Sequence, residues 1–226
     1  CAAVCPTGAI IIKNDSHRLW KELNQEDTIA VAQVAPAVRV AVAKEFGYNG
    51  ENVMGKIVAA LRRIGFNYIF DTSTAADLTV MEESKEFADR LANGGKLPLF
   101  TSCCPAWIKY AENEYPEILP NISTCRSPMQ MFASVINEKF KGEGKKILSV
   151  AVMPCTAKKG EAARDEFKDE NGKPLVDFVI TTQELIMMIK EAGIVFNEIE
   201  PEAVDMPFGT MTGAGVIFGV TGLSLI

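Results

Sequence analysis

Long hydrophobic runs are missing from this sequence of 226 residues. No apolar segment approaches the roughly 18 residues that a membrane-spanning helix needs, and the N-terminus lacks the basic-then-apolar pattern of a secretory signal. An excess of positive charge is also missing, because the formal net charge is -6 and Lys and Arg are mixed with the acids. We therefore expect an intracellular protein that binds neither membranes nor nucleic acid.

Histidine is nearly absent. His17 is the only one, and a lone His on a short surface helix is far more often solvated than a ligand.

The six Cys residues do not form the disulfide frame of a small secreted protein, because most of them cluster at positions 1, 5, 103, 104 and 155 of a long chain. Paired C-x2-C units are lacking, so a plain zinc or thiol protein is the least favoured alternative.

Hydrophobic residues make up 48% of the sequence, enough for a substantial core in one large domain or two lobes. Periodicity and turn residues predict strands that alternate with helices, without an internal repeat or a long linker. The predicted strands are 9–12, 28–35, 67–70, 97–100, 147–153 and 176–181, and the predicted helices are 16–23, 36–46, 52–64, 75–91, 107–115, 128–140, 157–164 and 183–192. This alternation predicts an α/β fold with mainly parallel sheets flanked by helices.

Two helix details follow from the same patterns. Met129, Phe132, Ile136 and Phe140 share one face of their helix, which predicts core packing. Thr182 is expected to cap the helix that follows it, which leaves Glu184 out of position for a capping box.

Cys103 and Cys104 are adjacent thiols between an apolar strand and a helix, within the stretch Thr-Ser-Cys-Cys-Pro-Ala-Trp. Backbone N-H groups and the positive end of a helix meet at such a turn, which predicts a lowered thiol pKa and an anionic ligand or cluster. The alternative from these residues alone is a pair of buried free cysteines.

Cys155 stands beside a proline after a strand, in a place that we expect to be equivalent to that of Cys104. The carboxyl ends of parallel strands share one edge, where ligands bind, so the two Cys motifs can converge on one site. Lys158, within a turn of Cys155, would stabilise bound anions there, or would simply be solvated, as most lysines are.

Cys1 and Cys5 precede Pro6 in the spacing Cys-x3-Cys-Pro, which matches the second half of a bacterial ferredoxin cluster run. The alternative is a plain Cys-Pro turn that leads into the strand 9–12. The glycine-rich stretch 213–219 lacks the spacing and the preceding strand of a dinucleotide loop, so we assign it no ligand.

Taken together, the Thr-Ser-Cys-Cys-Pro-x-Trp and Met-Pro-Cys-x-x-Lys-x-x-Glu motifs resemble the first two of three signatures of the iron-only (FeFe) hydrogenases. Weaker similarity extends over essentially the entire chain. The resemblance implies a two-lobed catalytic domain, truncated at both ends, over 13–226, with a remnant of a ferredoxin-like 4Fe-4S domain over 1–12. It also implies an H-cluster, in which a 4Fe-4S cubane is joined to a diiron subsite that carries CO, cyanide and a dithiolate.

Site residues are implied by position in these motifs. Cys104 and Cys155 would be cubane ligands, and Cys1 and Cys5 would each bind an additional 4Fe-4S cluster of the N-terminal region. Lys158 would bind one cyanide, the backbone near Pro36 and Ala37 would bind the other, and Met153 would pack against the diiron unit.

The resemblance also implies a proton route. Cys103 would exchange protons with the subsite, and Glu83, Ser123 and Glu86 would carry them onward. From the sequence alone, Glu83 and Glu86 read more readily as two solvated carboxylates, although their spacing of three places both on one helix face.

Two departures from the family pattern stand out. The third signature, with the remaining cubane ligands, is not found before Ile226, so we expect the chain by itself to be inactive. Met129 occupies a position at which the family commonly has Gln. Cys125 also occurs in many relatives, and we expect its role to be structural.

The implied reaction is the reversible reduction of protons to dihydrogen, with electrons from ferredoxin or a similar carrier and with maturation proteins that supply the diiron subsite. The location would be cytoplasmic, or hydrogenosomal in an anaerobic eukaryote. The rival is a non-catalytic hydrogenase-like iron-sulphur assembly factor. Such relatives typically lack the first cysteine of the pair, so Cys103 favours the enzyme.

Overall fold

The computed structural model describes residues 4–206, 215 and 217, which leaves Cys1 and most of the glycine-rich stretch outside. Its strands are β1 (Thr28–Val34), β2 (Tyr68–Asp71), β3 (Lys146–Met153) and β4 (Phe178–Thr181). Its α-helices are α1 (Ser16–Leu23), α2 (Pro36–Glu45), α3 (Met54–Ile64), α4 (Ser73–Asn93), α5 (Pro105–Glu114), α6 (Pro128–Lys139), α7 (Ala157–Ala162) and α8 (Thr182–Glu191). Two short 3-10 helices are η2 (Pro116–Asn121) and η3 (Asp165–Phe167).

The four strands form one sheet in the order β2-β1-β3-β4, and every neighbouring pair is parallel. β1 lies in the middle and is buried from Ala30 to Val34 on both faces, as its unbroken run of small apolar residues predicts. The predicted α/β class with a parallel sheet is therefore confirmed.

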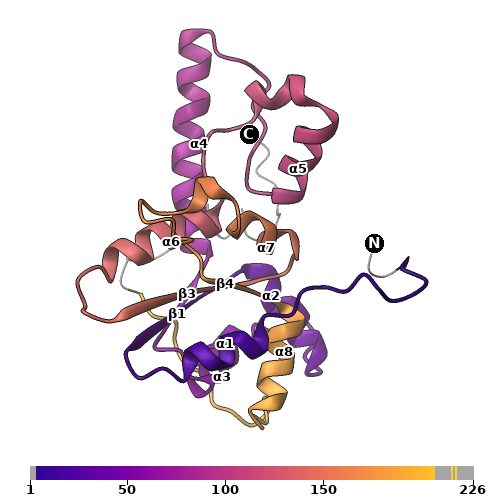
Figure 1. The fold of residues 1–226 in the computed structure, drawn as a ribbon, viewed down its shortest axis with the longest axis vertical. Helices are drawn as coiled ribbons and strands as arrows, with labels where there is room; N and C mark the ends of the chain where they lie inside the picture. The colour runs from indigo at the N-terminus through magenta and orange to yellow at the C-terminus, as the bar shows by residue number, and fades with distance from the viewer. Residues whose placement is uncertain (1–3, 207–214, 216, 218–226) are drawn as a thin grey trace.

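Helices cover both faces of this sheet (Figure 1). α1, α2, α3 and α8 pack on one face, and α6, α7 and the first turns of α4 lie on the other. Most of the core lies between the sheet and the first group of helices, while Phe132, Ile136 and Phe140 of α6 pack with Val31 and Phe70 in a smaller cluster. The predicted apolar face of α6 is thus buried.

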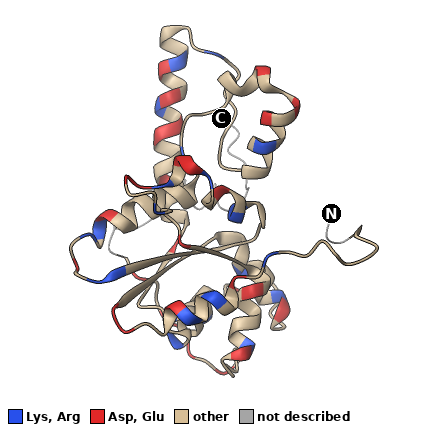
Figure 2. Ribbon diagram, viewed as in Figure 1, with Lys and Arg blue, Asp and Glu red and all other residues tan. Residues whose placement is uncertain are grey.

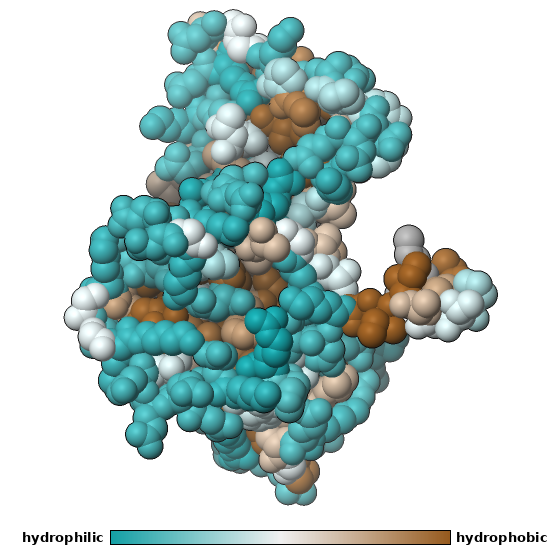
Figure 3. All heavy atoms as spheres, in the orientation of Figure 1, coloured by the Kyte–Doolittle hydropathy of each residue, from teal (hydrophilic) through white to brown (hydrophobic). Residues whose placement is uncertain are grey.

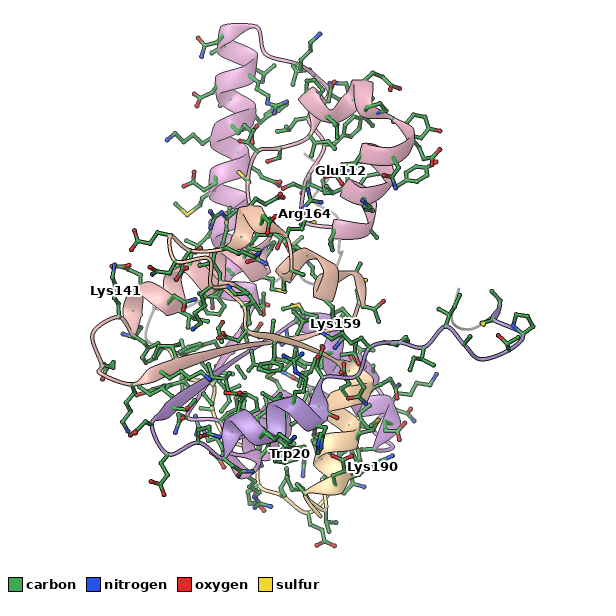
Figure 4. The ribbon with its side chains drawn as sticks, viewed as in Figure 1. Trp20, Glu112, Lys141, Lys159, Arg164 and Lys190 are labelled. Atoms are coloured by element: carbon green, nitrogen blue, oxygen red, sulfur yellow. The ribbon has the colours of Figure 1, made fainter. Side chains whose placement is uncertain are left out.

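A second, smaller lobe rises from the carboxyl edge of the sheet. α4 extends well beyond the sheet, and α5 and η2 stand beside its far half (Figure 1). Glu112 of α5 and Arg164 after α7 form an ion pair of 2.6 Å between this lobe and the sheet lobe (Figure 4). The two-lobed shape that the resemblance implies is present.

Two predicted strands are wrong. Residues 97–100 form only a single bridge, from Phe100 to Ile122, because no neighbouring strand runs beside them in the described part of the chain. Residues 9–12 are irregular and exposed, on an arm that leaves the body of the molecule (Figures 1 and 3). Four apolar residues make a strand only where a partner edge accepts their hydrogen bonds.

The cap of α8 also differs from the prediction. Thr181, not Thr182, is the N-cap, and its side chain accepts a hydrogen bond from the backbone N-H of Glu184. The Glu184 side chain accepts from the Thr181 backbone in return, so a complete capping box is present. The prediction placed the helix start one residue too late.

Candidate active site

A cavity of about 230 Å³ lies at the carboxyl edge of the sheet. The segments that follow β1, β2 and β3 meet the start of α5 and the start of α6 there, as expected for a ligand site of a parallel sheet. Seven residues singled out from the sequence line this cavity: Pro36, Ala37, Cys103, Cys104, Met153, Cys155 and Lys158. Residues from three separate stretches of the chain are thus brought to one place.

The three cysteines at the cavity differ in their setting. Cys155 lies two residues after the end of β3 and is exposed, and Cys104 is the exposed N-cap of α5. Because residues 97–100 are not a strand, the predicted equivalence of Cys104 and Cys155 is wrong at the level of the fold. Both thiols nevertheless border the same cavity.

Cys103 is only partly accessible, and burial raises the pKa of its thiol above the ordinary value. A hydrogen bond from Thr101 and the positive charge of Lys158 act in the opposite direction but do not outweigh burial. The predicted lowering of the thiol pKa is therefore wrong for Cys103. At neutral pH this residue carries its proton and can donate it.

Lys158 supplies positive charge to the cavity. Its ammonium group donates to the backbone oxygen of Cys103 at 2.8 Å and to Oε2 of Glu161 at 2.7 Å. The side chain is mostly buried, so the alternative of a solvated surface lysine is wrong.

Apolar side chains make up much of the remaining wall. Met129 and Met153 are both buried and line the cavity together with Ala35, Ala76, Pro105, Pro128 and Pro154. Met129 contributes no polar side-chain contact here, and its backbone oxygen accepts a hydrogen bond of 3.0 Å from Gln33. A cation in such surroundings attracts an anionic ligand more strongly than it would in water.

Glu83 and Glu86 lie on the side of α4 that faces the segments on either side of α5. Neither is the solvated carboxylate that the sequence alone favours. Glu83 is 1% exposed and accepts a hydrogen bond of 2.9 Å from the hydroxyl of Thr101. The same Thr101 side chain lowers the pKa of the Cys103 thiol. Thr101 therefore connects the thiol to Glu83, a link that sequence reasoning missed although the residue belongs to the motif.

Glu86 accepts hydrogen bonds from Ser123 at 2.8 Å and from Arg90 at 2.6 Å. Burial alone would raise the pKa of Glu86, but the hydrogen bonds from Ser123, Arg90 and the Thr124 backbone outweigh it and hold the pKa below its ordinary value. Glu86 also borders a shallow outer cavity of about 550 Å³, so this pair leads toward solvent.

Arg90 was missed by sequence reasoning. Besides Glu86, it donates to the backbone oxygens of Lys96, Pro120 and Ile122, and so joins α4 to the loop before α5 and to the end of η2. Its spacing of four residues after Glu86 on one helix was the available signal.

Cys5 lies on the arm and not at the cavity. Hydrogen bonds from Thr7 and nearby backbone N-H groups lower the pKa of its thiol to about 7, which favours the thiolate that binds metal. Val4 and Ile10 to Ile12 beside it are exposed apolar residues (Figure 3).

The donor chemistry of the cavity fits an iron-sulphur cofactor in part. Two thiols, one cation and an apolar wall suit a cluster with anionic ligands. Within residues 4–206, 215 and 217, no group of three or more Cys, His, Asp or Glu side chains is arranged to hold a metal ion. Cys104 and Cys155 are two thiols at the cavity, whereas a cubane needs four thiolates.

The distribution of charge agrees with the composition. Lys and Arg are interspersed with Asp and Glu over both lobes (Figure 2). Among the described helices, none is long and apolar enough to cross a membrane.

Comparisons with known proteins give consistent matches. The chain is 46% identical to the NADP-reducing hydrogenase subunit HndD of Solidesulfovibrio fructosivorans over 98% of its own length and 40% of the relative's. It is 35% identical to the cytosolic iron-sulfur assembly component 3 of Bos taurus, with 89% of this chain and 46% of that protein covered. The chain thus spans less than half the length of both relatives.

A variant of the FeFe-hydrogenase of Chlamydomonas reinhardtii has a similar structure, with a TM-score of 0.79 and 37% identity over 89% of this chain and 53% of that one. The family model described as "Iron only hydrogenase large subunit, C-terminal domain" matches residues 28–224. With the two cysteine motifs at one cavity of a parallel sheet, these matches show that the chain belongs to the iron-only hydrogenase large-subunit family.

Proposed function

We propose that the protein to which this chain belongs catalyses the reversible reduction of protons to dihydrogen, with electrons from ferredoxin or a similar carrier. The observation that carries the proposal is the meeting of Cys103, Cys104, Cys155 and Lys158 at one largely apolar cavity, with a buried acid connected to Cys103 through Thr101.

The cofactor proposed for the cavity is the H-cluster. Cys104 and Cys155 would supply cubane thiolates, Lys158 would donate to one cyanide, backbone near Pro36 and Ala37 would donate to the other, and Met153 would pack against the diiron subsite. When bound, the cofactor supplies the iron centre at which dihydrogen is made or split. Maturation proteins would deliver the diiron subsite.

Proton movement is the part assigned to side chains of this chain. The Cys103 thiol, protonated at neutral pH, gives up or takes a proton at Sγ, and Thr101 connects it to Glu83. Ser123 and Glu86 form the outer pair, next to the outer cavity. Within the described residues no direct hydrogen bond joins Glu83 to Ser123, and a water molecule between them would complete the route.

Electron supply is proposed for the N-terminal arm. Cys5, with its lowered pKa, and Cys1 would be ligands of 4Fe-4S clusters in a ferredoxin-like region, of which residues 1–12 would be the C-terminal remnant. For the whole protein, we propose a location in the cytoplasm, or in the hydrogenosome if the host is an anaerobic eukaryote.

The rival function is that of a hydrogenase-like assembly factor, which carries clusters without turning over hydrogen. The 35% identity to an assembly component supports it, whereas the presence of Cys103 at the cavity supports the enzyme. An iron assay and a hydrogen-evolution assay on the complete, matured protein separate the two. Bound iron with hydrogen evolution is expected, and bound iron without it would support the assembly factor.

A further inference from the structure

Glu161 lies beside the cavity but has no role in the function proposed above. It is 5% exposed, and both of its carboxylate oxygens are engaged. Oε1 accepts a hydrogen bond from the hydroxyl of Ser127, and Oε2 accepts one of 2.7 Å from Lys158. A continuous hydrogen-bonded series of Ser127, Glu161 and Lys158, called here the Ser127 series, therefore ends at the cavity wall.

Two hydrogen bonds fix the direction of the Lys158 ammonium. One goes to Glu161 and the other to the backbone oxygen of Cys103. No other acceptor in the described part of the chain bonds to it, which leaves one of its three N-H donors for a ligand in the cavity that Lys158 lines. Lysine has a flexible four-carbon stem, so without these two acceptors its charge would not keep one direction.

Ser127 is itself held in place by the start of α6. It is the N-cap of α6 and accepts a hydrogen bond from the backbone N-H of Gln130. Met129, two residues further on, lines the same cavity as Lys158. Ser127 and Glu161 also line a second, more polar cavity of about 510 Å³. The Glu161 carboxylate thus stands between the polar cavity and the apolar one.

We propose that Glu161 is a positioning residue for Lys158 and that Ser127 in turn positions Glu161. The carboxylate holds the ammonium, through a charge-assisted hydrogen bond, where its free N-H donates to an anionic ligand of the bound cofactor. Glu161 itself does not touch that ligand. This inference rests on the proposed function, because it concerns the same cavity.

Two substitutions of Glu161 test it in the complete, matured protein. Glu161→Gln keeps the shape but loses the charge, and Glu161→Asp keeps the charge but is too short to reach both partners. The infrared cyanide stretching bands report the hydrogen bond from Lys158 independently of turnover. We expect both variants to shift one cyanide band and to lower hydrogen evolution on the order of tenfold to a hundredfold, at wild-type iron content.

Ser127 provides a second pair of variants with a built-in rescue. Ser127→Gly removes the hydroxyl at little cost to the helix cap and should shift the same band, whereas Ser127→Thr retains the hydroxyl and should restore it. If the Glu161 variants do not fold, this pair still tests whether the hydrogen bonds from Ser127 through Glu161 position Lys158.

The matched control is Glu112→Gln. Glu112 lines the polar cavity beside Glu161 and pairs with Arg164, but it does not line the apolar cavity. The Glu112→Gln variant should leave both cyanide bands at their wild-type positions. Unchanged bands in Glu161→Gln and Ser127→Gly would overturn the positioning role. A wild-type protein with no cyanide bands and no hydrogen evolution would instead overturn the proposed function.

Discussion

Arg90 stabilises the fold and also holds Glu86, the outer carboxylate of the proposed proton route. Its guanidinium group bonds the Glu86 carboxylate and three backbone oxygens, and both members of the ion pair are largely shielded from water. Removal of the cation would take from Glu86 its charged partner and from the three backbone oxygens a hydrogen-bond donor, which is more costly than the loss of a surface ion pair.

Arg90→Met is therefore expected to lower the free energy of unfolding by about 2 to 3 kcal/mol at pH 7. Because the pKa of Glu86 is lowered in the folded state, the stability from its ionised form is present above its ordinary pKa of 4.5. That stability is lost as the pH falls through the lowered value. Urea unfolding of wild type and variant over this acid range should show the difference shrink. A difference that grows toward acid would contradict the assignment.

Helix α4 illustrates close packing at the scale of an element. Gly215 donates its backbone N-H to Asp77 of α4 at 2.6 Å. A Cβ at position 215 would collide with the backbone oxygen of Ser73 and would lie 2.7 Å from Oδ1 of Asp77. Only glycine fits this close approach to the first turns of α4.

Gly215→Ala should therefore lower stability by about 1 to 3 kcal/mol, as expected for overpacking. Gly160→Ala in α7 is the matched control, because a Cβ there meets nothing within 4 Å. The control should raise stability by roughly 0.5 to 1 kcal/mol through helix propensity. Thermal unfolding measures both, and equal effects of the two substitutions would contradict the packing argument.

The elements also show what the sequence could predict. Strands such as β1 and helices such as α3 were predicted within about two residues, because their periodicity and their terminal Gly or Pro residues are local signals. Residues 97–100 could not be told from a strand, since four apolar residues carry no information about a partner edge. The meeting of Cys104 and Cys155 was predicted from the shared carboxyl edge of a parallel sheet, although Cys104 does not follow a strand. The Thr101 link, the Arg90 contacts and the raised pKa of Cys103 depend on burial and side-chain direction, which the sequence does not give.

At the scale of the whole molecule, two lobes meet at the cavity. The ion pair between Glu112 and Arg164 joins α5 to the segment after α7 (Figure 4), and the pKa of Arg164 is raised chiefly by its hydrogen bond to Glu112. Both side chains are about 30% exposed (31% and 28%), so the stabilisation is modest.

Arg164→Met is expected to lower stability by about 1 kcal/mol and to make this stability difference depend on salt, because partly exposed pairs are screened. Urea unfolding at low and high ionic strength checks this. A stability difference that is independent of salt would show that the pair contributes through packing and not through charge.

The most direct test of the site compares two thiols of similar setting in the complete, matured protein. Cys103 lines the cavity, while Cys125 lies 3.7 Å from Glu86 and does not line it, and burial raises the pKa of both. If Cys103 moves the proton, Cys103→Ser should lower hydrogen evolution at least about a hundredfold, whereas Cys125→Ser should leave it within about twofold, both at wild-type iron content. Equal rates for the two variants would contradict the central role of Cys103.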